Sequence, residues 1–254
     1  MKWLRFAHAD HQGFGVLQGQ TVQVYAGEQF GDHAPTGQVL PLADINLLPP
    51  CEPRTVAGLW NNFHALAQKN GWVSPAEPLY FIKAAGSLAG PGSTTPAAPE
   101  AIGRVAFEGE LAIVIGRPAH AVSVDQAPAY IAGYTCANDI TAIEVLHRDA
   151  SFAQWTRAKG LPGFGVFGPV IETDFDYAQA TLRTRVSGRE RQNYALSDMI
   201  VPPAHLLSLI SQDIALQPGD LILCGTSLGV LPMKPGTEVE VEIDGIGVLQ
   251  HRYG

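Results

Sequence analysis

Three acidic residues in the middle of the chain have the side-chain type and spacing to hold a metal ion. Glu108 and Glu110 are separated by one residue within a largely apolar run, 105–116. In an extended strand, side chains two residues apart point to the same face, so these two carboxylates would lie side by side. Asp139 follows a second largely apolar run, 130–137. Carboxylate oxygens with positions left open for water suit Mg²⁺ or Mn²⁺ better than zinc.

The elements around these acids decide whether they meet. The run from Val105 to Ile115 predicts a strand that is buried on both faces, because apolar residues occupy consecutive positions. Two carboxylates inside such a strand repel each other and lose hydration, which a divalent cation would offset. The alternative is that the first half of the strand leaves the core and both glutamates lie in water. Asp139 is expected at a strand-to-helix junction, where its alternative role is an N-cap.

The remaining elements are expected to be short. The 27 glycines and 19 prolines are typical of many strands joined by tight turns. Apolar periodicity predicts helices over 62–70 and 204–214 and strands over 79–83, 221–224 and 237–243. In the last of these strands, glutamates alternate with valine and isoleucine, which indicates one wet face and one buried face.

The chain is expected to divide into a small N-terminal β segment with a linker, 1–50, and a larger catalytic domain, 51–254. Short β segments are expected over 3–26, and a Gly-, Pro- and Asp-rich linker over 27–54. The predicted fold class is a β-rich α+β fold with short helices.

Composition excludes several classes of protein. The formal net charge is −8 and there is no basic patch, so nucleic acid is not an expected partner. No apolar stretch approaches the roughly 20 residues of a membrane-spanning helix, and no signal peptide is expected. Three distant cysteines indicate neither a disulfide framework nor a thiolate zinc site. The expected location is the cytoplasm.

Four segments resemble the fumarylacetoacetate hydrolase family, and the similarity runs through about residues 56–250. The segments that carry it are Pro78–Lys83 with Ser87–Gly92, Phe107–Leu111, Gly133–Asp139, and Pro218–Asp220 followed by Gly225-Thr226. The resemblance implies a roll of mixed β-sheets with short helices, usually in a homodimer. It also implies that Glu108, Glu110 and Asp139 ligate Mg²⁺ or Mn²⁺.

The same resemblance implies roles for three further residues. Lys159 matches a lysine near the metal, where it would balance charge and hold a substrate oxygen. Thr226 matches a threonine that helps bind the substrate carboxylate. His64 matches a catalytic histidine on a mobile segment, which works with a glutamate to activate water. Without the resemblance, Lys159 would be read as a surface lysine and Thr226 as a turn hydroxyl.

Three positions depart from the family pattern. Many relatives place the partner glutamate three residues after the histidine, but this chain has Ala67 there, followed by Gln68. Relatives often carry Arg and Gln where this chain has Ile143 and Leu146. The predicted metal ligands are therefore intact, whereas the groups for acid–base chemistry and substrate orientation are altered.

The resulting prediction is a Mg²⁺-dependent hydrolase that cleaves a C–C bond in a 2,4-dioxo acid of the acylpyruvate or fumarylpyruvate type, with the metal stabilising an enolate. The first alternative is a decarboxylase or isomerase of a 2-oxo acid or diacid in aromatic catabolism, which needs no activated water. The second is a binding protein without catalysis. Trp60, Trp72 and Trp155 are interpreted as packing anchors.

Overall fold

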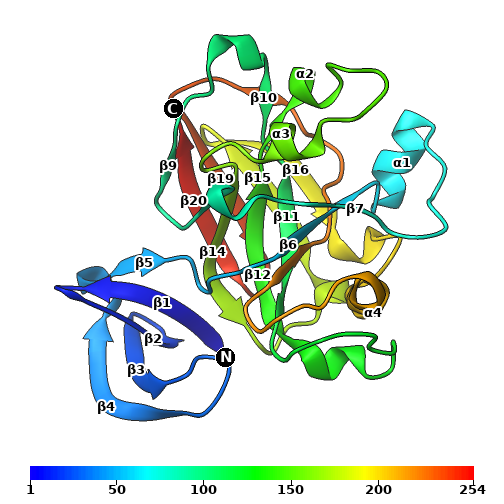
Figure 1. Cartoon of the computed structure of the whole chain (residues 1–254). Helices are drawn as coiled ribbons and strands as arrows, with labels where there is room; N and C mark the ends of the chain where they lie inside the picture. The colour runs from blue at the N-terminus through cyan, green and yellow to red at the C-terminus, as the bar shows by residue number, and fades with distance from the viewer.

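The computed structural model describes the whole chain, residues 1–254, and is built mainly of strands (Figure 1). Strands hold 44% of the residues and helices of all kinds hold 18%, which confirms the β-rich class with short helices. The α-helices are α1 (His64–Asn70), α2 (Ile143–Leu146), α3 (Trp155–Lys159) and α4 (Pro203–Asp213). None of them has the length and hydrophobicity needed to span a bilayer.

The N-terminal part holds two strands within residues 27–54, so the linker predicted there is wrong. Its strands are β1 (Lys2–His8), β2 (His11–Gln18), β3 (Thr21–Gly27), β4 (His33–Pro41) and β5 (Asn46–Leu48). In β4 only Leu40 is buried, so no alternation of apolar and polar residues marked it as a strand. Backbone pairing with β3 holds β4 in place, and that pairing is not visible in the side-chain pattern.

A twelve-stranded mixed sheet connects the N-terminal strands to the rest of the molecule. Its order is β4-β3-β2-β1-β14-β12-β11-β17-β6-β7, with β5 beside β1 and β8 beside β14. The strands added to the N-terminal set are β6 (Val56–Trp60), β7 (Leu79–Ile82), β8 (Leu88–Ala89), β11 (Gly109–Ile115), β12 (Ile131–Asp139), β14 (Gly165–Glu172) and β17 (Leu221–Leu223). Because β1 pairs with β14, one sheet spans both parts, and the division at residue 50 stays a prediction.

Two smaller sheets complete the fold. The first has the order β13-β10-β18, with β10 (Val105–Ala106), β13 (Thr141–Ala142) and β18 (Pro232–Met233). The second has the order β16-β15-β19-β20-β9, with β9 (Thr94–Thr95), β15 (Thr181–Val186), β16 (Arg189–Ala195), β19 (Thr237–Ile243) and β20 (Gly247–Tyr253). In β19 the valines and the isoleucine are buried while the glutamates are exposed or half-buried, as predicted.

Strand β11 lies at the centre of the molecule, and all seven of its residues are buried. Leu111 and Ile113 pack into the larger hydrophobic cluster, whereas Ala112 and Val114 pack into a second cluster on the other face. The prediction of a strand with two buried faces is therefore confirmed. The single strand predicted over 105–115 is interrupted, however, because its first two residues form β10 and pair with β13 and β18 in another sheet.

Candidate metal centre

Pairing between β11 and β12 brings the three acidic residues together. The two strands are antiparallel, and Glu110 stands opposite Ala137. Glu108 lies just before β11, where its N–H donates to Asn138 Oδ1 (2.8 Å) and its C=O accepts from the N–H of Asp139 (2.9 Å). One oxygen of each carboxylate lies within 4.8 Å of the others. The sequence expectation that these three side chains converge is met by the geometry.

Glu110 is the most deeply buried of the three acids. Its side chain is fully buried, and Oε2 accepts a hydrogen bond from the N–H of Gly225 (2.8 Å). Its other oxygen, Oε1, has no hydrogen-bond partner in the protein. Burial raises the pKa of this carboxyl well above its ordinary value, and the charge of Asp139 adds to the effect. A buried carboxylate oxygen without a partner costs free energy that a bound cation would offset, so the cluster fits a divalent ion.

Two buried lysines lie against the acidic cluster. Lys159 donates to Glu108 Oε2 (2.7 Å) and to Asp139 Oδ2 (2.5 Å). Lys83 lies with Nζ 2.8 Å from Asp139 Oδ1 and donates to the backbone carbonyl of Lys159 (2.5 Å). Burial alone would raise the pKa of Asp139, but these two ammonium groups outweigh it and lower that pKa.

The net charge of the acids and lysines indicates the charge of a ligand that the site could accept. With all five groups ionised, three carboxylates and two ammonium groups sum to −1, and a divalent cation would bring the sum to +1. A singly charged anion would then neutralise the site. Lys83 was missed as a site residue, although it ends the first segment of the family resemblance; its chain position gives no sign that it reaches Asp139.

Thr226 lines a cavity beside the acidic cluster, and its hydroxyl already makes two hydrogen bonds within the protein. The hydroxyl donates to the carbonyl of Gly109 (2.9 Å) and accepts from Gln192 Nε2 (2.8 Å). Gln192, a buried residue of β16, also accepts from the N–H of Gly109 through Oε1 (3.0 Å). To donate to a substrate carboxylate, Thr226 must exchange its bond to Gly109. Gln192 carries no sequence signal, because its contact with Gly109 spans 83 residues of chain.

His64 is the one candidate residue that neither belongs to the acidic cluster nor lines the cavity beside it. It is the first residue of α1, its side chain is exposed, and it does not line the cavity beside the metal ligands. The same helix reaches that cavity through Leu66, Lys69 and Asn70. Ala67, at the position of the family glutamate, is buried and supplies no carboxylate. A histidine–glutamate pair is therefore absent from α1.

The acidic cluster opens into a cavity of about 320 Å³, whose wall includes Glu108, Lys159 and Thr226. Glu108 is the most exposed of the three acids, with 18% of its side chain accessible to solvent. A second cavity of about 540 Å³ adjoins the first, and the two share four aromatic lining residues: Trp60, Trp72, Phe81 and Trp155.

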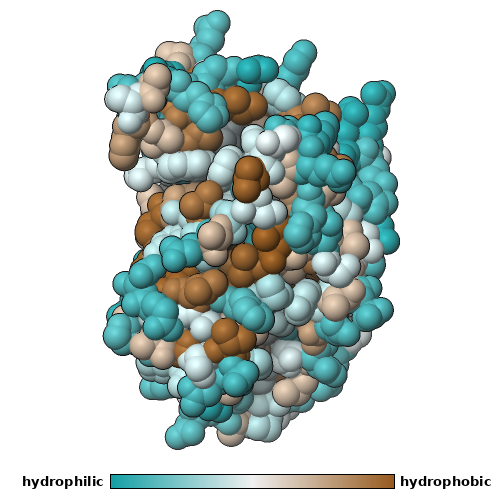
Figure 2. Space-filling model, turned by 90° about the vertical axis from the view of Figure 1, so that its right-hand side faces the viewer, coloured by the Kyte–Doolittle hydropathy of each residue, from teal (hydrophilic) through white to brown (hydrophobic).

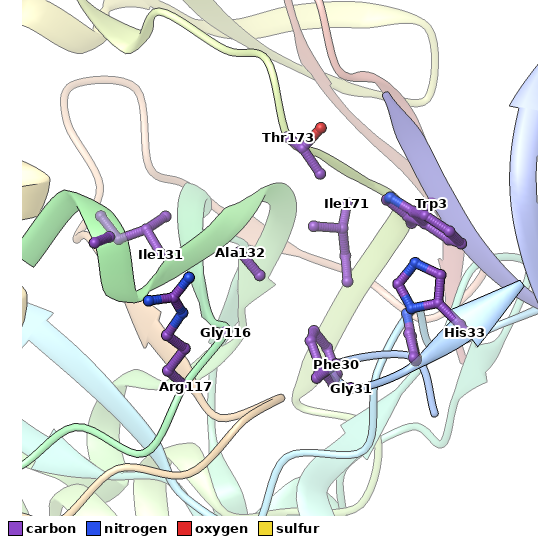
Figure 3. A pocket seen from close by; sticks show the side chains of 12 residues that line it. Trp3, Phe30, Gly31, His33, Gly116, Arg117, Ile131, Ala132, Ile171 and Thr173 are labelled. Atoms are coloured by element: carbon purple, nitrogen blue, oxygen red, sulfur yellow. The ribbon is translucent and has the colours of Figure 1, made fainter. Parts of the chain in front are cut away.

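A third cavity, of about 300 Å³, lies between the loop before β4 and the strands β1, β12 and β14 of the large sheet (Figure 3). Trp3 and His33 form one wall with ring centroids 4.8 Å apart, and Arg117 lies across from them. No acidic residue lines this cavity, so it is separate from the candidate metal centre.

Comparison with known proteins identifies the family of the chain. Residues 55–253 match the family model described as fumarylacetoacetate (FAA) hydrolase C-terminal. Residues 1–50 match the model described as Rv2993c-like, N-terminal. The chain belongs to the fumarylacetoacetate hydrolase family.

Individual relatives add names to the family assignment. Protein Rv2993c of Mycobacterium tuberculosis is 39% identical over 96% of this chain and 95% of its own length. The 4-hydroxyphenylacetate degradation bifunctional isomerase/decarboxylase of Escherichia coli is 35% identical over 78% of this chain, which spans 46% of that longer protein. The solved structure of 2-hydroxyhepta-2,4-diene-1,7-dioate isomerase from Mycobacterium marinum covers all of this chain with a TM-score of 0.90 and 38% identity.

Proposed function

We propose that this protein is a Mg²⁺-dependent enzyme that isomerises or decarboxylates a 2-oxo acid through an enolate. The observation that carries the proposal is the buried acidic cluster with an unpartnered oxygen on Glu110, set beside two lysines at the end of a cavity. Oxygen ligands of this kind favour Mg²⁺ or Mn²⁺. The family names of the relatives, isomerase and decarboxylase, support the same class of reaction.

One set of residues would bind the ion, and another would bind the substrate. Glu108, Glu110 and Asp139 would hold the cation, which when bound supplies Lewis acidity to stabilise negative charge on the 2-oxo oxygen. Lys159 keeps two of these carboxylates in position and presents its ammonium group on the cavity wall, where it attracts the substrate's negative charge. Thr226 offers its hydroxyl to the substrate carboxylate once it leaves Gly109.

The position of His64 favours a reaction that uses no activated water. Hydrolysis needs a general base close to the attacking water. His64 is exposed, and position 67 is alanine. Isomerisation and decarboxylation share the enolate with hydrolysis but omit the attack of water, so they fit this arrangement better.

Hydrolysis of a C–C bond in a 2,4-dioxo acid is the second candidate. It is favoured by two features of α1: this helix carries His64 and lines the cavity, and the carboxylate of Asp198 contacts its first turn. Asp198 Oδ2 accepts from the N–H of Ala65 (3.0 Å), next to His64 in the chain. A movement of α1 toward the cluster would bring the histidine closer to the substrate.

Product analysis separates the two candidates. The purified protein is incubated with Mg²⁺ and either oxaloacetate or an acylpyruvate, with Mg²⁺ alone as the background. CO₂ release from oxaloacetate above background supports the first candidate, whereas pyruvate plus a free acid from the acylpyruvate supports hydrolysis. EDTA and Glu110→Gln should each abolish turnover. Failure to turn over any 2-oxo or 2,4-dioxo acid would instead indicate a binding protein without catalysis.

A further inference from the structure

Aromatic side chains gather next to the candidate metal centre. Trp60, Trp72, Phe81 and Trp155 (hereafter the aromatic wall) line both the cavity of the acidic cluster and the adjoining cavity. We propose that the aromatic wall binds the tail of the substrate and selects an apolar, preferably aromatic, tail over one that ends in a carboxylate. This inference rests on the proposed action on 2-oxo acids.

The aromatic wall is a set of mutually packed rings from separate parts of the chain. Phe81 and Trp155 are stacked with centroids 5.0 Å apart and an interplanar angle of 5°. Trp60 lies 4.8 Å from Trp72 and 6.5 Å from Trp155. They come from β7, α3, β6 and the segment that follows α1. Packed rings present flat apolar faces, against which a planar group stacks favourably.

One helical turn links this wall to the acidic cluster. Trp155 and Lys159 are the first and last residues of α3, four positions apart, so their side chains lie on the same side of the helix. Lys159 Nζ lies 5.2 Å from the centroid of Phe81 and contacts both Glu108 and Asp139. A 2-oxo acid with its head at the cluster therefore has its tail directed toward these rings.

The second cavity offers little to a carboxylate. Its lining contains no lysine or arginine, and six of its eight residues are hydrophobic. The Tyr80 hydroxyl donates to Asp213 (2.9 Å), and His147 is exposed. A carboxylate moved from water into such surroundings loses hydration without gaining a lysine or arginine partner, which weakens binding. Lys69 lies on the first cavity, but it is exposed and screened by water and salt.

Part of the aromatic wall and of the cavity around it is exposed to solvent. Trp72 is 38% exposed and Leu79, in the same cavity, is 44% exposed. Apolar side chains gather in patches on the face of the molecule that carries α1 and α4 (Figure 2). Large apolar side chains left open beside a cavity are typical of a surface that a ligand covers. The tryptophans are therefore more than packing anchors.

Three ligands with the same head and different tails test the inference. 2-Oxobutanoate, 2-oxo-4-phenylbutanoate and 2-oxohexanedioate have methyl, phenyl and carboxylate ends, and none has the second oxo group needed for C–C hydrolysis. Their dissociation constants are measured by calorimetry with the Mg²⁺-loaded protein and again in EDTA. We expect the phenyl compound to bind at least about tenfold more tightly than the other two.

Variants assign the preference to the aromatic wall. Trp155→Ala should reduce the phenyl advantage to less than about threefold, whereas Trp155→Phe should retain most of it. Phe152→Ala is the matched control, because Phe152 is 69% exposed on the loop before α3 and lines neither cavity. Trp72→Ala repeats the test at a partly exposed position, should Trp155→Ala fail to fold.

The outcomes distinguish this inference from the proposed function. If 2-oxobutanoate binds with Mg²⁺ but the phenyl compound gains nothing, or 2-oxohexanedioate binds most tightly, the tail assignment is wrong and the proposed function stands. It is equally wrong if the phenyl advantage survives both tryptophan-to-alanine variants. If none of the three acids binds in a Mg²⁺-dependent way, the proposed function fails and the tail assignment fails with it.

Discussion

At the scale of single residues, the candidate centre depends on a carboxylate that the protein alone does not satisfy. Glu110 is fully buried and its Oε1 has no partner. We therefore expect the difference in stability between Glu110→Gln and the wild type to depend on whether metal is present. In EDTA the variant should be more stable than the wild type by about 1 kcal/mol or more, because the burial that raises the pKa of Glu110 also destabilises the fold and a neutral amide avoids that cost. With Mg²⁺ only the wild type should gain stability, as measured by urea unfolding.

The control for this prediction is Glu238→Gln. Glu238 is exposed on β19, far along the chain from the cluster, and its neutralisation should leave the response to Mg²⁺ unchanged. A Glu110→Gln protein that is stabilised by Mg²⁺ as strongly as the wild type would mean that Glu110 is not a ligand.

At the scale of elements, β11 meets the five-stranded sheet so closely at Gly109 that no side chain fits. A Cβ there would lie 2.1 Å from Thr184 Oγ1 on β15 and 3.1 Å from Gln192 Oε1 on β16. Gly109→Ala must displace these buried side chains or the strands that carry them, so we expect a loss of about 1–3 kcal/mol in the free energy of unfolding. Gly86→Ala, where nothing lies within 4 Å, should change it by less than about 0.5 kcal/mol.

A second element-scale contact makes stability depend on pH. Asn138 uses Oδ1 to accept from Glu108, so its amide group donates to His251 Nε2 (2.7 Å), which must be unprotonated. Burial lowers the pKa of His251 to about 4 from its ordinary value of 6.5. The unfolded chain thus takes up the proton first, and stability present above pH 6.5 is lost as the pH falls toward 4.

Comparison with a variant that does not titrate isolates this effect. Between pH 7.5 and 5, the wild type should lose up to about 2 kcal/mol more than His251→Gln, measured by urea unfolding. Parallel losses in the two proteins would show that another group is responsible.

At the scale of the whole molecule, metal binding should stabilise the fold by mass action. The ligands come from β11, β12 and the turn before β11, so the site exists only when these segments are assembled. Mg²⁺ at 100 times its dissociation constant adds about 2.7 kcal/mol. For a chain of this size we expect Tm to rise by roughly 5–10 °C, and EDTA to reverse it. Scanning calorimetry with and without Mg²⁺ measures the shift; an unchanged Tm would contradict the metal assignment.

The family resemblance also leads us to propose a homodimer. Light scattering coupled to size-exclusion chromatography should then give twice the mass of the 27.1 kDa chain. A mass of one chain at micromolar concentration would contradict this proposal.

The spacing of apolar residues was enough to predict some elements: strands with apolar residues at alternate positions or on both faces, and one amphipathic helix. The burial of β11, the alternation in β19 and the approximate extent of α4 all follow from apolar spacing, because burial of apolar surface dominates their stability. Acids within apolar strands need a compensating charge, which made a site of Glu108, Glu110 and Asp139 a candidate, and the family resemblance implied that the three converge.

Tertiary structure decided what depends on contacts between distant segments. Strand β4 exists because β3 pairs with it, and Lys83 reaches Asp139 across more than fifty residues of chain. Gln192 and the aromatic wall likewise gain their places through packing of several strands and α3. Residue type and spacing determined which chemistry this protein can host, because charge and hydrophobicity are local properties. The packing of the strands determined which residues surround the acidic cluster, because contacts between distant segments produce no periodic pattern in the sequence.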